Sequence, residues 1–155
     1  MTNHIIFEMS KEAKRVKGFD RNRKKNQGSN WIWRGTRKVI YWAASHRCVW
    51  CNKSSEEDGV ELSLDHIVPN AYGGSNLKGN LVTCCTRCNS VRGDKLIPQW
   101  LKYMEENLDF SSEEVAEAQA RLFKSFDAHT TTRWNEHRKA AIAAGYLVKT
   151  PKGYR

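Results

Sequence analysis

The spacing of apolar and polar residues changes along the chain and predicts two short strands and a helix near its middle. Residues 60–66 alternate apolar and polar side chains over seven positions, which is the pattern of a half-buried strand. A polar, glycine-containing loop at 70–78 separates it from a second short strand at 80–83. A short helix is expected to begin near Cys85 and to stop at Gly93 or Pro98.

Helical periodicity predicts further helices on both sides of this unit. Apolar residues at 36–46 cluster as on a helix that packs on a small domain. Residues 99–107 follow a proline, which is favoured at a helix start. Ser111 and Glu114 form a capping-box pattern that opens another helix. A last helix is expected at 132–144.

The length of 155 residues suits one domain with appendages. We divide the chain into a partly disordered basic arm at 1–35, a central domain at 36–97 and a helical extension at 98–155. The basic tail at 149–155 is expected to be loose. Mean hydropathy is −0.72, and no run approaches the ~20 apolar residues of a membrane span, so we expect a soluble protein. The apolar stretch near the start is too short for a secretory signal, which predicts a cytoplasmic location.

Positive charge is concentrated at the start of the sequence. The net charge is +9, and residues 1–40 carry eleven Lys and Arg against three acids. A solvated face would normally mix in acids, so this run favours nucleic-acid binding. The candidate contacts are Arg21, Arg23, Lys24, Lys25 and Arg34.

Trp31 and Trp33 follow the basic run and allow two interpretations. Aromatic rings beside cations suit nucleic acid, with bases or sugars against the rings and phosphates on the cations. Alternatively, both indoles dock the arm onto the domain.

Five cysteines are present, and four of them form two C-x-x-C pairs separated by thirty-three residues. In a reducing compartment this arrangement favours metal over disulfides, because each pair directs two thiolates at one point, as tetrahedral Zn²⁺ requires. Cys84 adjoins Cys85, and only Cys85 repeats the spacing of the first pair. We therefore predict Cys48, Cys51, Cys85 and Cys88 as ligands of a closed, structural zinc site that stabilises the domain.

A second group combines Asp65 and His66 at a strand end with Asn80 and Asn89. A histidine beside an acid can activate water, and carboxylate and amide oxygens suit Mg²⁺ or Mn²⁺. By itself, an Asp-His dipeptide is more often a hydrogen-bonded core feature. Neighbouring side chains of a regular strand point to opposite faces, so the strand end is expected to twist or bulge.

Together these motifs resemble the zinc-bearing branch of the HNH endonuclease family. The shared features are C-x-x-C, D-H-I-x-P, G-G, N-L and C-x-x-C-N within residues 45–96. The resemblance implies an α+β class with a small ββα-metal core flanked by helices, and hydrolysis of DNA phosphodiesters to 5′-phosphate and 3′-hydroxyl ends. Family members often have His where Asn89 stands, so this is an H-N-N variant in which metal affinity is expected to be weaker.

The resemblance also implies a role for each site residue. His66 would be the general base, and Asp65 and Asn89 would hold one Mg²⁺ or Mn²⁺ on the scissile phosphate and the leaving oxygen. Asn80 would tie the hairpin loop so that His66 is oriented. Arg92 lies three residues after Asn89, so on a helix it either contacts the same phosphate or is solvated.

DNA is the expected partner, with no membrane and no small-molecule cofactor. The competing class is a non-catalytic zinc-containing module that binds nucleic acid, and RNA or modified DNA remain alternative substrates. Nicking or double-strand cleavage, a homing, restriction, packaging or defence role, the oligomeric state and the role of the C-terminal helices stay open. The family suggests a bacterial or phage-infected cell.

Overall fold

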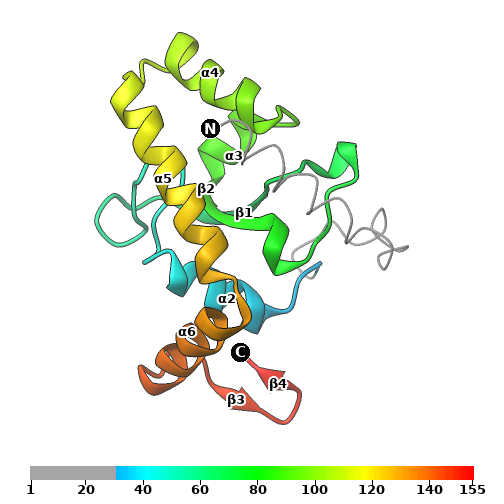
Figure 1. The fold of residues 1–155 in the computed structure, drawn as a ribbon. Helices are drawn as coiled ribbons and strands as arrows, with labels where there is room; N and C mark the ends of the chain where they lie inside the picture. The colour runs from blue at the N-terminus through cyan, green and yellow to red at the C-terminus, as the bar shows by residue number, and fades with distance from the viewer. Residues whose placement is uncertain (1–30) are drawn as a thin grey trace.

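The fold is built around a β-hairpin followed directly by a helix (Figure 1). The computed structural model describes residues 31–155, so the basic residues predicted at 21–25 lie outside it. Strands β1 (Leu62–His66) and β2 (Leu81–Cys85) pair antiparallel, and α3 (Thr86–Arg92) follows β2 at once. This order of strand, loop, strand and helix is the predicted one, and the predicted α+β class with a small sheet and flanking helices is confirmed.

The hairpin has two differently covered faces. In its register Leu64 lies opposite Thr83, Asp65 opposite Val82 and His66 opposite Leu81. Leu64 packs with residues of α2 (Arg34–Ala43), and Thr83 donates its hydroxyl to the Ile40 carbonyl at 3.2 Å. The register runs through His66 without interruption, so the expected bulge is absent from β1. Asp65 and His66 therefore lie on opposite faces, as strand geometry dictates.

The loop between the strands is held by one buried amide. It contains two short 3₁₀ turns, Asn70–Tyr72 and Lys78–Asn80. Oδ1 of Asn80 accepts from the Val68 amide at 2.8 Å, and its Nδ2 donates to the carbonyls of Val68 and Ser75 at 3.1 and 2.8 Å. The backbone of Gly74 approaches Val68 so closely that a β-carbon would lie 1.7 Å from the Val68 oxygen.

The C-terminal helices share the core of the central unit. Helices α4 (Ile97–Asn107) and α5 (Ser112–Ala128) bury Trp100, Met104 and Leu122 against Trp50 and the cysteines. Trp100 meets Trp50 edge to face, with ring centroids 6.1 Å apart. Ser111 caps α5 through the predicted capping box with Glu114. The packing thus crosses the boundary that the sequence placed after residue 97.

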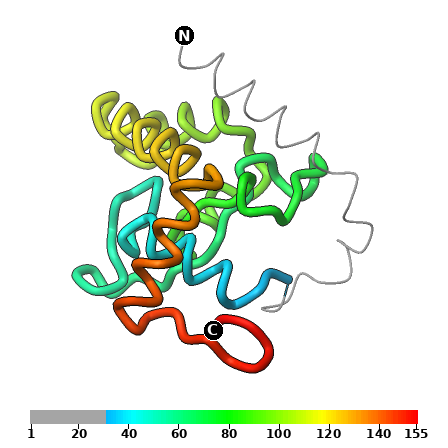
Figure 2. The backbone as a smooth tube through the Cα atoms, turned by 60° about the horizontal axis from the view of Figure 1, so that its bottom comes forward, coloured from blue at the N-terminus to red at the C-terminus, as the bar shows by residue number. Residues whose placement is uncertain are grey.

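The other end of the chain returns to α2. Helix α6 (Thr131–Ala143) packs on α2, and the tail forms a small hairpin of β3 (Lys149–Thr150) and β4 (Gly153–Tyr154) beside it (Figure 2). A β-carbon on Gly35 would lie 2.8 Å from the Tyr154 carbonyl oxygen, so the contact needs a glycine. The expectation of a loose tail was wrong, because Tyr154 docks on α2 and the two short strands pair.

Within the described residues, no helix combines the length and the apolar character needed to cross a membrane.

We predict that Gly74→Ala destabilises the protein by at least ~2 kcal/mol, because the added methyl group meets backbone that cannot move independently. Gly79→Ala is the matched control, since a β-carbon there meets nothing within 4 Å. Urea unfolding of both variants measures the effect. Equal stabilities would show that the loop relaxes freely around residue 74.

Candidate active site and metal centre

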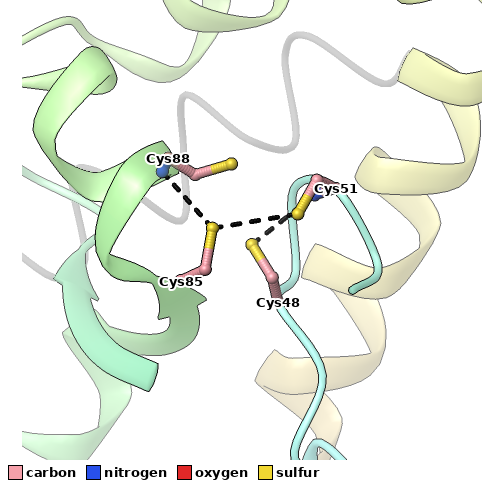
Figure 3. A group of neighbouring side chains, drawn as sticks. All are labelled: Cys48, Cys51, Cys85 and Cys88. Carbon is pink, nitrogen blue, oxygen red and sulfur yellow. Dashed lines mark hydrogen bonds between the residues drawn. The ribbon is translucent and has the colours of Figure 1, made fainter. Parts of the chain in front are cut away.

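Four cysteine sulfurs converge from two parts of the chain (Figure 3). Cys48 and Cys51 come from the loop after α2, whereas Cys85 ends β2 and Cys88 lies in the first turn of α3. All four Sγ atoms lie within 4.8 Å of one another, and those of Cys51 and Cys85 are 3.8 Å apart. Tetrahedral zinc with Zn–S bonds of ~2.3 Å separates its sulfur ligands by about 3.8 Å. The donor set and spacing therefore fit a closed zinc site.

Local backbone geometry prepares these sulfurs for a cation. The amide of Cys51 donates to Sγ of Cys48 at 3.5 Å, and the amide of Cys88 donates to Sγ of Cys85 at 3.4 Å. Hydrogen bonding with Cys48 lowers the pKa of Cys85 to about 6, whereas bonding to Cys51 raises the pKa of Cys48. Without a cation, the sulfurs must share protons. Metal binding requires thiolates and would release those protons.

Cys84 lies outside this group. It is buried, and its Sγ lies 3.3 Å from the Ser63 hydroxyl oxygen. Burial raises the pKa of its thiol, which keeps the sulfur protonated. The structure therefore separates the adjacent cysteines in the way that their spacing predicted.

A buried ion pair occupies the α3 side of β1. Asp65 is 4% exposed, and its Oδ2 accepts hydrogen bonds from Nη1 of Arg92 at 2.7 Å and from the indole Nε1 of Trp50 at 3.0 Å. Arg92 is fully buried, and it also donates to the carbonyls of His66 and Ile67 at 2.6 and 2.8 Å. Arg92 thus links the Asp65 carboxylate to the backbone that carries His66.

Both sequence interpretations of Arg92 need correction. A fully buried guanidinium is not solvated, and its contacts to Asp65 and two carbonyls occupy it within the protein. Helical spacing correctly placed Arg92 near the face of Asn89, but that face packs on β1. The predicted DNA contact of Arg92 is not supported.

His66 lies on the other face of β1 and is oriented by two side chains. Its Nε2 lies 2.8 Å from Oδ1 of Asn76, and its ring stacks on Trp31 with centroids 5.1 Å apart. The guanidinium of Arg37 lies over the Trp31 ring, 5.5 Å from its centroid. His66 is half-buried, so part of its surface stays accessible.

The two asparagines occupy different positions around the hairpin. Asn89, half-buried in α3, donates from Nδ2 to the Ser63 hydroxyl at 3.0 Å and to the Leu64 carbonyl at 3.3 Å. Its amide is thereby fixed against β1, beside the strand that carries Asp65. Asn80 is buried in the loop and ties Val68 to Ser75, next to the segment that follows His66.

The tryptophans predicted to act together have different environments. Trp31 packs on His66, as the docking interpretation requires. Trp33 is 74% exposed, and Arg34 beside it is exposed as well. The docking interpretation therefore holds for Trp31, whereas nucleic-acid contact by Trp33 stays a prediction.

Two other histidines, His46 and His129, are used in packing. His129 is buried against Trp134, and burial lowers the pKa of its imidazole to about 4, so the ring is neutral near pH 7. His46 contacts the rings of Trp42 and Tyr146 edge-on.

Trp50 and Asn76 are contacts that the sequence analysis missed. Trp50 stands between the cysteines of the first pair, where a buried indole must find an acceptor for its N–H group. That requirement was a usable signal. Asn76 lies in a polar loop where several side chains have similar character, so no pattern distinguishes it.

Comparison with known proteins agrees with this geometry over the central part of the chain. The segment of residues 48–104 matches the family model described as HNH endonuclease. It contains all four clustered cysteines together with Asp65, His66, Asn80 and Asn89. A search of curated proteins finds no significant match.

One solved structure that resembles the chain is the crystal structure of the Type II-C Cas9 enzyme from Actinomyces naeslundii. The sequence identity is 20%, and the match covers 93% of this chain but only 19% of that protein. The chain thus spans about a fifth of the larger enzyme. A TM-score of 0.35 is too low to assign a fold or an activity.

We predict that Cys85→Ser loses zinc and unfolds, whereas Cys84→Ser keeps both zinc and fold, because only Cys85 belongs to the sulfur cluster. Metal analysis of the purified proteins and circular dichroism measure the two effects. The reverse pattern would assign the ligand role to Cys84.

We also predict that Arg92→Ala lowers the free energy of unfolding by ~3–5 kcal/mol, because it leaves the Asp65 carboxylate buried without its cation. Arg87→Ala, at an exposed position of the same helix, should change stability by less than ~0.5 kcal/mol. Denaturant unfolding of both variants tests this. A small effect at residue 92 would contradict a structural role for the ion pair.

Proposed function

We propose that this protein is a metal-dependent endonuclease that hydrolyses DNA phosphodiester bonds, with His66 as the general base. The observation that carries the proposal is the arrangement along β1. His66 lies on one face of that strand, and Asp65 and Asn89 lie on the other, within the segment that matches the HNH endonuclease family model.

One edge of β1 is bonded to β2, and within residues 31–155 no strand pairs with the other. On that outer edge the carbonyls of Leu64 and His66 accept from Asn89 and Arg92 of α3. A phosphodiester beside this edge could be approached by His66 from one side and by Asn89 from the other. Such an approach would not require a bulge in β1.

The hydrogen bond to Asn76 supports a base role for His66. Oδ1 of Asn76 lies 2.8 Å from Nε2 and so orients the imidazole ring. A neutral imidazole has one nitrogen lone pair, which could take a proton from the attacking water. General-base catalysis of this kind typically contributes ~10²–10⁴-fold to the rate.

Asp65 and Asn89 are the residues that would hold a divalent cation. Both hydrogen bonds to Asp65 end on Oδ2, which leaves Oδ1 for a cation, and Asn89 offers an amide oxygen. Such hard oxygen donors suit Mg²⁺ or Mn²⁺. When bound, the cation would stabilise the negative charge that develops on the phosphate and the leaving oxygen. The Arg92 contact to the same carboxylate is consistent with weak cation binding.

The remaining groups would support the site. Asn80 fixes the loop that follows His66, and the cysteine cluster would hold zinc without an open coordination position. Zinc would therefore stabilise the fold and take no part in hydrolysis. The products would be 5′-phosphate and 3′-hydroxyl ends.

The proposal is tested by incubating zinc-loaded protein and supercoiled plasmid with Mg²⁺ or Mn²⁺. Wild type is expected to nick or linearise the DNA, EDTA to stop the reaction, and His66→Ala to lower the rate by at least ~10²-fold.

His46→Asn is the matched histidine control and should retain activity, because His46 packs against Trp42 and Tyr146. If wild type binds DNA but leaves it intact with every cation, the catalytic proposal fails and a binding module replaces it.

A further inference from the structure

Positive charge in the described chain is segregated at one end of the fold. Residues 131–155 hold six Lys and Arg against a single acid, whereas residues 41–130 hold nine against thirteen. The basic C-terminal segment packs on α2, which has three cations and no acid. Along the sequence, positive charge is concentrated in the N-terminal arm. Folding adds a second basic region beside α2.

A groove lies between α2, α6 and the β3–β4 hairpin. Its volume is about 180 Å³, and we call it the C-terminal groove. Trp33 and Tyr154 line it together with Trp134, and the Arg138 guanidinium lies 5.2 Å from the Tyr154 ring centroid. None of its lining residues is acidic. They are Trp33, Gly35, Thr36, Val39, Trp134, Arg138, Leu147 and Tyr154.

Exposure distinguishes this groove from an ordinary packing defect. Trp33 is 74% exposed, although its six-membered ring would be only 3.9 Å from a β-carbon at Gly153. Arg34 beside it and Arg138 across the groove are exposed too, as are Lys149 and Lys152 on the hairpin. Aromatic faces beside cations form the stacking and phosphate-binding surface that single-stranded or locally opened nucleic acid requires.

The groove is connected to the proposed active site by aromatic packing. Trp134, which lines the groove, packs against the same apolar cluster as Trp31. Trp31 in turn stacks on His66. The C-terminal groove and His66 therefore share the α2 side of the hairpin, so one bound strand could contact both.

We propose that the C-terminal groove binds the DNA flanking the scissile phosphodiester, with a base against Trp33 and phosphates on Arg138 and the hairpin lysines. This inference rests on the proposed nuclease function, because it assigns the groove to the substrate of that site. Charge complementarity identifies a polyanion, and the exposed indole favours one with stackable bases.

The test measures binding of labelled DNA by fluorescence anisotropy at several salt concentrations. All variants are made in the full-length, zinc-loaded protein with His66→Ala, so that the DNA stays intact. Trp33→Ala removes the indole, and the pair Lys149→Gln and Lys152→Gln removes two exposed charges. The pair Lys102→Gln and Lys124→Gln on α4 and α5 is the matched control, since both lysines are exposed away from the groove.

Trp33→Ala should weaken binding about tenfold without changing the salt dependence, because stacking releases no counterions. The Lys149 and Lys152 pair should lower the slope of log affinity against log salt by about 1.4–1.8, the value for two lost phosphate contacts. The control pair should bind like the parent. Thermal unfolding and zinc content identify any variant whose fold has changed. If Trp33→Ala is unstable, the Lys149 and Lys152 pair still tests the groove.

The inference is overturned if the groove variants and the control pair bind DNA alike. It is also overturned if the groove variants lose affinity for RNA but not for DNA. Its failure is separable from that of the nuclease proposal. If the wild type cleaves DNA normally and the groove variants bind DNA like the parent, only the groove proposal is rejected. If the wild type does not cleave DNA but binding depends on the groove, the nuclease proposal is rejected and the groove proposal stands.

Discussion

The four-sulfur cluster is the constraint on which the rest of the structure depends. It joins the loop after α2 to the junction of β2 and α3, two segments that are distant in the sequence and that short-range structure alone would not hold together. The loop that it fixes also carries Trp50, whose indole reaches Asp65. Asp65 pairs with Arg92, and Arg92 holds the carbonyl of His66. The geometry of the proposed base is thus linked to the four-sulfur cluster through a short series of buried contacts.

These buried contacts explain how a two-stranded hairpin can hold the proposed active-site side chains in fixed positions. Two paired strands are marginal in isolation, and an edge strand is free to shift its register. Here β1 is fixed by Arg92 and Asn89 on one face and by the packing of Leu64 and Trp31 on the other. Breaking the buried pair from one side would leave a charge without a partner, which is a much larger cost than losing a surface ion pair. Rigidity at the site therefore comes from buried polar contacts as well as from apolar packing.

Local patterns predicted the elements well because their causes are local. Alternation, the capping box at Ser111 and the spacing of Cys85 relative to Cys88 each depend on neighbouring residues. The errors arose where distant segments meet. Nothing near Arg92 indicates that its helix face packs on β1, and nothing in the polar tail indicates that Tyr154 docks beside Gly35. The expected twist or bulge at Asp65 and His66 followed from requiring that metal and water meet at one phosphate, and the register of β1 continues through His66 without a bulge.

We propose that two metal sites have separate duties, with sulfur ligands for structure and oxygen ligands for hydrolysis. Electron paramagnetic resonance of Mn²⁺ added to zinc-loaded protein with bound DNA separates the two. We expect bound Mn²⁺ in the wild type, weaker binding in Asn89→Ala and unchanged zinc content in both. Mn²⁺ that binds equally well to the variant, or that displaces zinc, would contradict the account.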